Sequence, residues 1–164
     1  MIEVKITKEQ VKRAEELYEF DVLNNSIMRG KSNIYGALGE ILVADHYSNM
    51  GLTVDCTATR DYDLIIEGKK IDVKTKRTTV VPRGEYNCSI AAYNTKQRCD
   101  LYFFARVNEE KTIGYLLGLM PKKRFFATAI FNKKGEVDPS GNGKWKFTAD
   151  CYNLEISKLK KPKK

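Results

Sequence analysis

Residues 62–76 read Tyr-Asp-Leu-Ile-Ile-Glu-Gly-Lys-Lys-Ile-Asp-Val-Lys-Thr-Lys, and this stretch decides the fold. It predicts two short strands joined by a two-residue type II′ turn at Gly68-Lys69, because glycine suits the first central position of that turn. Opposed residues on paired strands share a face, and faces alternate with period two. The resulting register places four apolar side chains on one face, which we expect to lie in the core: Leu64, Ile66, Ile71 and Val73.

The other face of the predicted hairpin carries Asp63, Asp72 and Lys74. Two carboxylates on neighbouring strands repel each other unless positive charge lies between them. Mg²⁺ is the cation that this pair predicts, because it prefers hard oxygen ligands. Lys74 would then lie beside the metal, where its ammonium would position or polarise a water.

This arrangement resembles the active site of the PD-(D/E)xK nuclease superfamily, in which an acidic residue and a (D/E)-x-K tripeptide lie on successive strands. Asp63 matches the first acid, Asp72 the second and Lys74 the lysine. Tyr62 replaces the usual Pro and Asp72 the commoner Glu, but neither departure removes a ligand oxygen or the amine. The resemblance covers roughly residues 34–107. It implies a restriction-endonuclease-like α/β fold, with a central mixed β-sheet flanked by helices.

The resemblance implies three further site residues. Many members add a Glu from a preceding helix, and Glu40 fits that position, with a solubilising surface residue as the alternative. Its neighbours Gly36 and Gly39 are poor helix formers, which predicts a close approach of this helix to the sheet or to a phosphate backbone. The backbone carbonyl of Val73 would be a metal ligand. Some members use a Gln beyond the lysine, which makes Gln97 a candidate, with a plain turn residue as the alternative.

Length and composition indicate one domain. The chain has 164 residues, which suits a single hydrophobic core. We expect one nuclease domain over residues 1–157, with an N-terminal helix at about 8–25, and a basic tail at 158–164. The charged N-terminus does not match a signal peptide, and no apolar run reaches the roughly 18 residues of a membrane span. We therefore expect a cytoplasmic protein with no membrane partner, in a bacterial or phage-infected cell.

The metal-binding residue types also narrow the chemistry. The four cysteines form no C-x-x-C pair, which argues against a zinc site. The single histidine, His46, excludes a multi-histidine metal site. Carboxylate oxygens therefore remain as the ligands that this sequence offers.

Positive charge predicts the partner. The formal net charge is +8, and a basic protein favours a polyanion, most simply DNA. The alternative is a solvated basic surface that aids solubility. The predicted DNA contacts flank the hairpin or lie in the tail: Lys69, Lys70, Lys76, Arg77, Lys160 and Lys161.

Hydrophobic periodicity and turn residues predict the other elements. A helix at about 33–49 would begin at a Ser32 cap and end at Gly51. Strands are expected over residues 52–56, 85–93, 100–107, 112–120 and 147–156, and a polar loop over 132–144. Pro121 would be the first residue of a short helix that ends at about Ala127.

Together these features predict a Mg²⁺-dependent deoxyribonuclease, with Mn²⁺ as a substitute metal, that hydrolyses phosphodiester bonds as an endonuclease. We expect it to be structure-directed or weakly sequence-specific, as in small phage or Holliday-junction-resolvase-like members, and compatible with a homodimer. One alternative is a non-catalytic nucleic-acid-binding protein with a nuclease-like fold. Another is a structural protein in which Asp63 and Asp72 simply pair with Lys74 and Lys70.

Overall fold

The structure, a computed structural model, describes residues 1–23, 34–57, 59, 61–139 and 145–163. Its strands are β1 (Ile2–Lys5), β2 (Val54–Asp55), β3 (Leu64–Ile66), β4 (Lys69–Thr78), β5 (Asn87–Ala91), β6 (Leu101–Asn108), β7 (Ile113–Pro121), β8 (Ile130–Asn132) and β9 (Cys151–Glu155). Its α-helices are α1 (Lys8–Leu23), α2 (Ile34–Asn49) and α3 (Lys122–Thr128), and single 3₁₀ turns lie at η1 (Ala92–Asn94) and η2 (Ile156–Lys158).

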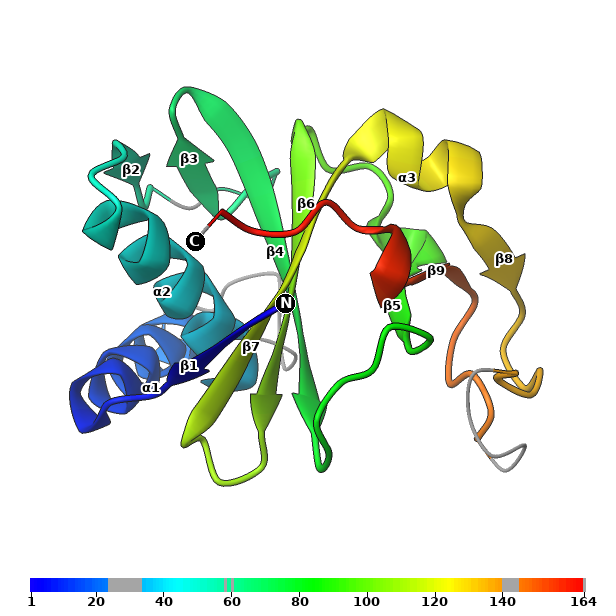
Figure 1. Ribbon diagram of the computed structural model, residues 1–164, viewed down its shortest axis with the longest axis horizontal. Coiled ribbons are helices and arrows are strands. Elements are labelled where there is room, and N and C mark those ends of the chain that lie inside the picture. Colours follow the sequence, from blue (N-terminus) through cyan, green and yellow to red (C-terminus); the bar gives the residue numbers. More distant parts are fainter. Residues whose placement is uncertain (24–33, 58, 60, 140–144, 164) are drawn as a thin grey trace.

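The strands form two sheets. Six strands make a mixed sheet in the order β1-β7-β6-β4-β3-β2, in which β4 and β6 are parallel and the other neighbours antiparallel. A smaller antiparallel sheet has the order β5-β9-β8. Figure 1 shows α1 and α2 on one side of the large sheet and the small sheet with α3 on the other. The predicted mixed α/β class with a helix-flanked mixed sheet is confirmed, whereas the separate small sheet was not predicted.

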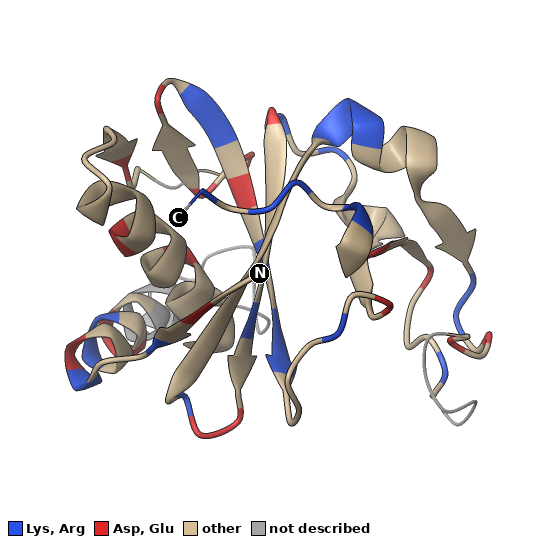
Figure 2. Ribbon diagram, viewed as in Figure 1, with Lys and Arg blue, Asp and Glu red and all other residues tan. Residues whose placement is uncertain are grey.

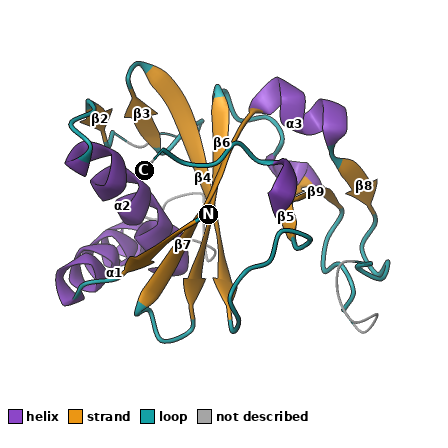
Figure 3. Cartoon of the chain, in the orientation of Figure 1, coloured by secondary structure: helices purple, strands orange, loops and turns teal. Residues whose placement is uncertain are grey.

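Both faces of the large sheet are buried, so the molecule has two cores. On β6 the side chains alternate between them: Phe103 and Val107 pack with α2, while Tyr102 and Phe104 pack beneath β5, β9 and α3. An almost unbroken apolar run is what a strand covered on both faces requires. The strand predicted over residues 100–107 is confirmed as β6, and it lies in the middle of the large sheet (Figure 3).

The β3–β4 hairpin differs from the prediction in register. Leu64 pairs with Ile71 and Ile66 with Lys69, so the two turn residues are Glu67 and Gly68 rather than Gly68 and Lys69. Both have positive φ, 48° and 74°, as a type I′ turn requires. The residue before β2 supports the strained Glu67, because the Glu67 Oε1 accepts the Thr53 N–H at 2.7 Å.

This shift of two residues leaves every side chain on its predicted face, since the side-chain period is also two. The predicted core residues Leu64, Ile66, Ile71 and Val73 are all buried. The prediction of the two faces is therefore confirmed, although the turn and the paired residues were wrong.

Helix boundaries follow local signals. The reciprocal bonds of a capping box form at the start of α1, where Gln10 N donates to Thr7 Oγ1 at 3.2 Å and Thr7 N to Gln10 Oε1 at 3.0 Å. Pro121 ends β7 and caps α3 instead of beginning it. Gly51 follows α2 with a φ of 78°, as predicted for its end. The predicted Ser32 cap lies outside the described residues.

Residues 158–163 do not form a free basic tail, which corrects the prediction. Leu159 is buried in the core beneath β9, and Pro162 is buried further on. Lys160 exchanges two backbone hydrogen bonds with Leu119 of β7, at 2.9 and 3.0 Å. We call residues 158–163 the C-terminal strap. It covers the second half of the β7 edge, while β1 covers the first half.

No helix in the described part of the chain is long and apolar enough to span a membrane.

Candidate active site

Asp63 lies just before β3 and is tied to β4 on both sides of Asp72. Its backbone N–H donates to the Ile71 carbonyl at 2.9 Å, and its Oδ2 accepts the Val73 N–H at 2.7 Å. The hairpin therefore fixes the Asp63 carboxylate beside that of Asp72. The Val73 N–H thus holds the Asp63 carboxylate in place. The role of the Val73 carbonyl as a metal ligand stays a prediction.

Asp72 is the buried centre of the site, with 1% of its surface exposed. Its Oδ2 lies 2.7 Å from the Lys74 ammonium, and its Oδ1 accepts the Gln97 side-chain N–H at 3.1 Å. Asp72 and Lys74 are two residues apart on β4 and share a face, as predicted. Gln97 reaches Asp72 from the loop before β6, which the sequence could not place, so it is more than a plain turn residue.

Helix α2 brings Glu40 to the same place. A Cβ on Gly39 would lie 1.8 Å from Thr75 Oγ1 on β4, so only glycine allows the helix this close to the strand. Glu40, the next residue, is half-buried, and its negative charge contributes to the high pKa of Asp63. The predicted close approach of the helix to the sheet is confirmed at Gly39. Gly36 has no such contact, since nothing would lie within 4 Å of its added Cβ.

The carboxylates carry more negative charge than the site neutralises. Burial, then the charges of Glu40 and Asp72, raise the pKa of Asp63 well above its usual value. Burial also raises the pKa of Asp72, although the Lys74 ammonium beside it acts in the opposite direction. A shared proton or an added cation relieves such a pair. The electrostatics of the site therefore favour the binding of a proton or a cation at these two carboxylates.

The donor atoms suit a hydrated hard cation. Among the described residues, no three His, Cys, Asp or Glu side chains lie close enough to form a ready ligand cluster. Mg²⁺, however, keeps several waters and is often held by only one or two carboxylates. Asp63 and Asp72 supply those, and the buried Gln97 Oε1 has no hydrogen-bond partner within the described structure. The residues present therefore fit a magnesium ion.

The predicted DNA-contact residues do not all lie together. Lys69 and Lys70 are exposed at the start of β4, above Asp72 (Figure 2). Lys76 lies on the same face of β4 as Lys74, and its Nζ donates to Ser89 Oγ at 2.8 Å. Arg77 points to the other face and pairs with Glu109 at 2.8 Å, so the structure does not bring it to the site.

The strap lysines also lie apart from the carboxylates. Lys160 and Lys161 are exposed on the strap at the β7 edge, and β6 lies between β7 and the site strand β4. The structure therefore does not place them with Asp72.

Sequence reasoning missed two cations. Lys122, the first residue of α3, binds the Gln97 carbonyl through its ammonium and adds positive charge near Asp72. Arg106 is the register partner of Lys76 on the parallel strand β6. It is the one charged residue in the apolar run 101–107, and that interruption was the available signal. No comparable signal marked Lys122, because its approach depends on how α3 packs.

No protein-family model matches this chain, and no curated protein matches it either.

Proposed function

We propose that this protein is a divalent-metal-dependent nuclease with a restriction-endonuclease-like fold, and that DNA is its substrate. One observation carries the proposal: two adjacent carboxylates, of the half-buried Asp63 and the buried Asp72, share a site with Lys74 and with Glu40 from a glycine-docked helix. A structural acidic pair needs neither the glycine contact that brings in a third acid nor the Gln97 contact. A phosphodiester hydrolase needs a cation and an ordered water beside an anionic substrate.

Each side chain has a defined task in this proposal. Asp63 and Asp72 would hold Mg²⁺ or Mn²⁺, with Glu40 acting directly or through a metal-bound water. The metal supplies charge neutralisation for the phosphate and a water of lowered pKa. Lys74, beside Asp72, orients the attacking water and stabilises the charge that develops on the phosphate. Gln97 fixes the orientation of the Asp72 carboxylate.

The surrounding charge supports a polyanionic substrate. Lys69 and Lys70, which we call the basic rim, are exposed at the start of β4, and Lys122 adds positive charge near Asp72. A single strand end or an unpaired junction would reach the carboxylates past this basic rim. We therefore propose a structure-directed or weakly specific endonuclease, in line with a resolvase-like or phage-type enzyme that acts as a homodimer.

A structural role is the second candidate, and one contact favours it. Lys74 already pairs with Asp72 at 2.7 Å, as that alternative predicts. The same alternative also predicts that Lys70 pairs with a carboxylate. The Lys70 ammonium instead lies over the Tyr62 ring, 5.2 Å from its centre. A non-catalytic nucleic-acid-binding protein is the third candidate, and it would need the same basic rim without using the carboxylates.

A cleavage assay separates the three. Linear, single-stranded, flapped and four-way DNA, together with matched RNA, are incubated with the protein in Mg²⁺, Mn²⁺ or EDTA. The nuclease cuts at least one substrate in either metal and none in EDTA. Binding without cutting would favour the non-catalytic protein, and neither binding nor cutting would favour the structural role.

A further inference from the structure

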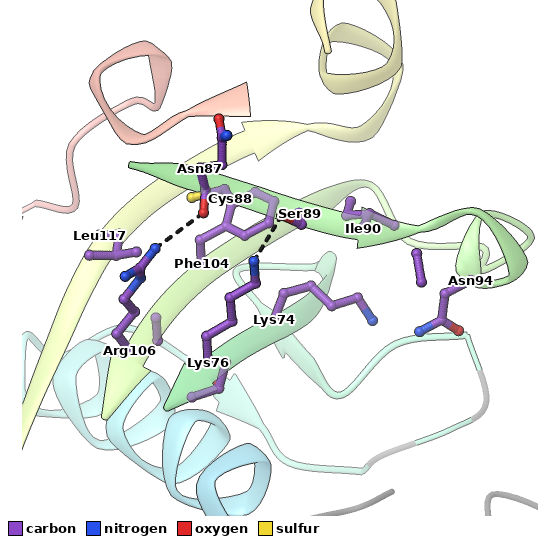
Figure 4. Close-up of a pocket in the computed structure, with 13 residues that line it drawn as sticks. Lys74, Lys76, Asn87, Cys88, Ser89, Ile90, Asn94, Phe104, Arg106 and Leu117 are labelled. Carbon is purple, nitrogen blue, oxygen red and sulfur yellow. Dashed lines mark hydrogen bonds between the residues drawn. The ribbon is translucent and has the colours of Figure 1, made fainter. Parts of the chain in front are cut away.

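A cavity of about 200 Å³ adjoins Lys74, between β4 and β6 of the large sheet and β5 of the small sheet (Figure 4). Three cationic side chains line it: Lys74, Lys76 and Arg106. The remaining polar lining is neutral and comes from Thr75, Asn87, Ser89 and Asn94. The cavity thus combines strong positive charge with hydrogen-bonding side chains, immediately next to the carboxylates.

The two inner cations are held in place by neutral groups. Lys76 Nζ donates to Ser89 Oγ at 2.8 Å, and Arg106 Nη2 donates to the Asn87 carbonyl at 3.2 Å. The Arg106 guanidinium also lies 5.4 Å from the centre of the Tyr86 ring. Figure 4 shows both side chains reaching from the large sheet toward β5. A hydroxyl and a carbonyl orient these charges, and Asp138, which accepts a hydrogen bond from the Asn87 side chain at 3.0 Å, is the acid whose charge acts on both cations.

The surroundings of the two cations disfavour their charge. Burial of its ammonium and the nearby Arg106 lower the pKa of Lys76, and burial lowers the pKa of Arg106. Lys76 and Arg106 are also register partners on adjacent parallel strands, so their like charges repel each other. An anion between them would remove that cost, and phosphate matches the planar fork of arginine particularly well.

We propose that this cavity binds one phosphate group of the nucleic-acid strand whose neighbouring bond is cut at Asp72. The inference rests on the proposed nuclease function and extends it. Asp72, Lys74 and Lys76 follow one another on one face of β4, about 7 Å apart at each step. A strand lying along this face therefore passes from the carboxylates to Lys76 and Arg106. Because β5 covers one side of the cavity, it leaves no room for a duplex. The phosphate therefore belongs to an unpaired strand or a strand end.

Binding measured in EDTA tests this without requiring catalysis. The probes are ten-nucleotide single DNA strands labelled at the 3′ end, with a 5′-phosphate or a 5′-hydroxyl, followed by fluorescence anisotropy at several salt concentrations. Lys76→Gln and Arg106→Gln are compared with the wild type. Lys12→Gln is the matched control, since Lys12 is an exposed lysine on α1 that pairs only weakly with Glu16 at 3.9 Å.

Each cavity variant should bind about tenfold or more weakly, as expected for a lost charged hydrogen bond. The slope of log affinity against log salt should fall by about 0.7 for each lost phosphate contact. The Lys12→Gln variant should keep the wild-type affinity and slope. A loss confined to the 5′-phosphate probe assigns the cavity to a terminal phosphate, and an equal loss with both probes assigns it to an internal one.

Affinity and slope unchanged in both cavity variants would overturn the proposal. Lys76→Gln keeps the test decisive if Arg106→Gln does not fold, because residue 76 is exposed and tolerates a polar replacement. The two proposals also fail separately. Metal-dependent cleavage with an unchanged slope would remove only the phosphate site, whereas a reduced slope without cleavage would remove only the nuclease assignment.

Discussion

At the residue scale, Asp63 shows how a half-buried negative charge in the site lowers the stability of the metal-free protein. Its raised pKa means that the folded protein holds this proton more tightly than the unfolded chain, whose aspartates titrate at about 3.9. The contribution of Asp63 to stability is therefore fully present below that value and is lost as the pH rises through the higher pKa of the folded state. Above the titration range of the unfolded aspartate, the raised pKa of Asp63 therefore lowers the stability of the metal-free protein.

Replacing Asp63 with Asn should therefore stabilise the metal-free protein, and more so at higher pH. The Asn carbonyl can still accept the Val73 N–H, so the backbone contact survives. Free energies of unfolding of the wild type and Asp63→Asn, measured in EDTA from pH 4 to 8, give the difference directly. We expect it to grow in favour of the variant as the pH rises. A difference that is flat, or that favours the wild type at pH 8, would mean that the carboxylate pair is not under electrostatic strain.

Lys74 separates catalysis from metal binding. Lys74→Met should cut DNA at least about 100-fold more slowly, the usual loss for one group that stabilises transition-state charge. Divalent-metal affinity should stay equal or increase, because the ammonium no longer competes for Asp72 Oδ2. Calorimetric titration with Mn²⁺ and single-turnover cleavage measure the two quantities. Loss of metal binding together with cleavage would instead make Lys74 a structural partner of the carboxylates.

At the scale of elements, the approach of α2 to β4 positions the third acid. Gly39→Ala should lower the free energy of unfolding by about 1–3 kcal/mol, the usual cost of overpacking, because the new Cβ would lie 1.8 Å from Thr75 Oγ1. It should also slow cleavage by moving Glu40. Gly36→Ala is the control on the same helix, and it should stabilise the protein by up to about 1 kcal/mol through helix propensity.

Urea unfolding of the two glycine variants checks this pair. Equal effects at Gly36 and Gly39 would show that helix propensity, rather than contact with β4, explains both glycines.

The elements also show what the sequence can and cannot predict. The two faces of the β3–β4 hairpin were predictable because alternation depends only on parity, which a two-residue shift preserves. The register was not, because Glu67 adopts a positive φ and its side chain is held by Thr53, which lies 14 residues earlier in the chain, just before β2. Gln97 illustrates the same limit. Its contact with Asp72 depends on the path of a loop, which no periodic pattern encodes.

At the scale of the whole molecule, the small sheet and the strap were hidden in the sequence. Residues 85–93 and 147–156 were readable as strands, but nothing in their pattern says that they pair with each other over the second core. The packing of the strap against the fold was not predicted because the segment is rich in lysine. A segment with several lysines reads as solvated, yet Leu159 and Pro162 alternate with them and are buried.

The strap allows packing and charge to be tested independently. Leu159→Ala should destabilise the protein by about 2–4 kcal/mol without changing the salt dependence of DNA binding. The double variant Lys160→Gln/Lys161→Gln should leave stability within about 0.5 kcal/mol, since both side chains are exposed. If these lysines contact phosphates as predicted, the double variant should also flatten the salt slope on duplex DNA by up to about two units.

Thermal unfolding and binding at several salt concentrations measure the two effects of the strap variants. A double variant with an unchanged slope would make the strap purely structural, and the basic rim at Lys69 and Lys70 would have to carry the DNA contacts.

The central claim is that Asp72 and Asp63 hold a catalytic metal, and Asp72→Asn tests it most directly. The substitution keeps the shape of the side chain and its capacity to accept the Gln97 N–H. The measurement is single-turnover cleavage of the best DNA substrate in Mg²⁺, beside Mn²⁺ titration of the same two proteins. We predict that the folded Asp72→Asn variant loses cleavage and binds Mn²⁺ at least about tenfold more weakly. Cleavage at the wild-type rate, with unchanged Mn²⁺ affinity, would contradict the account.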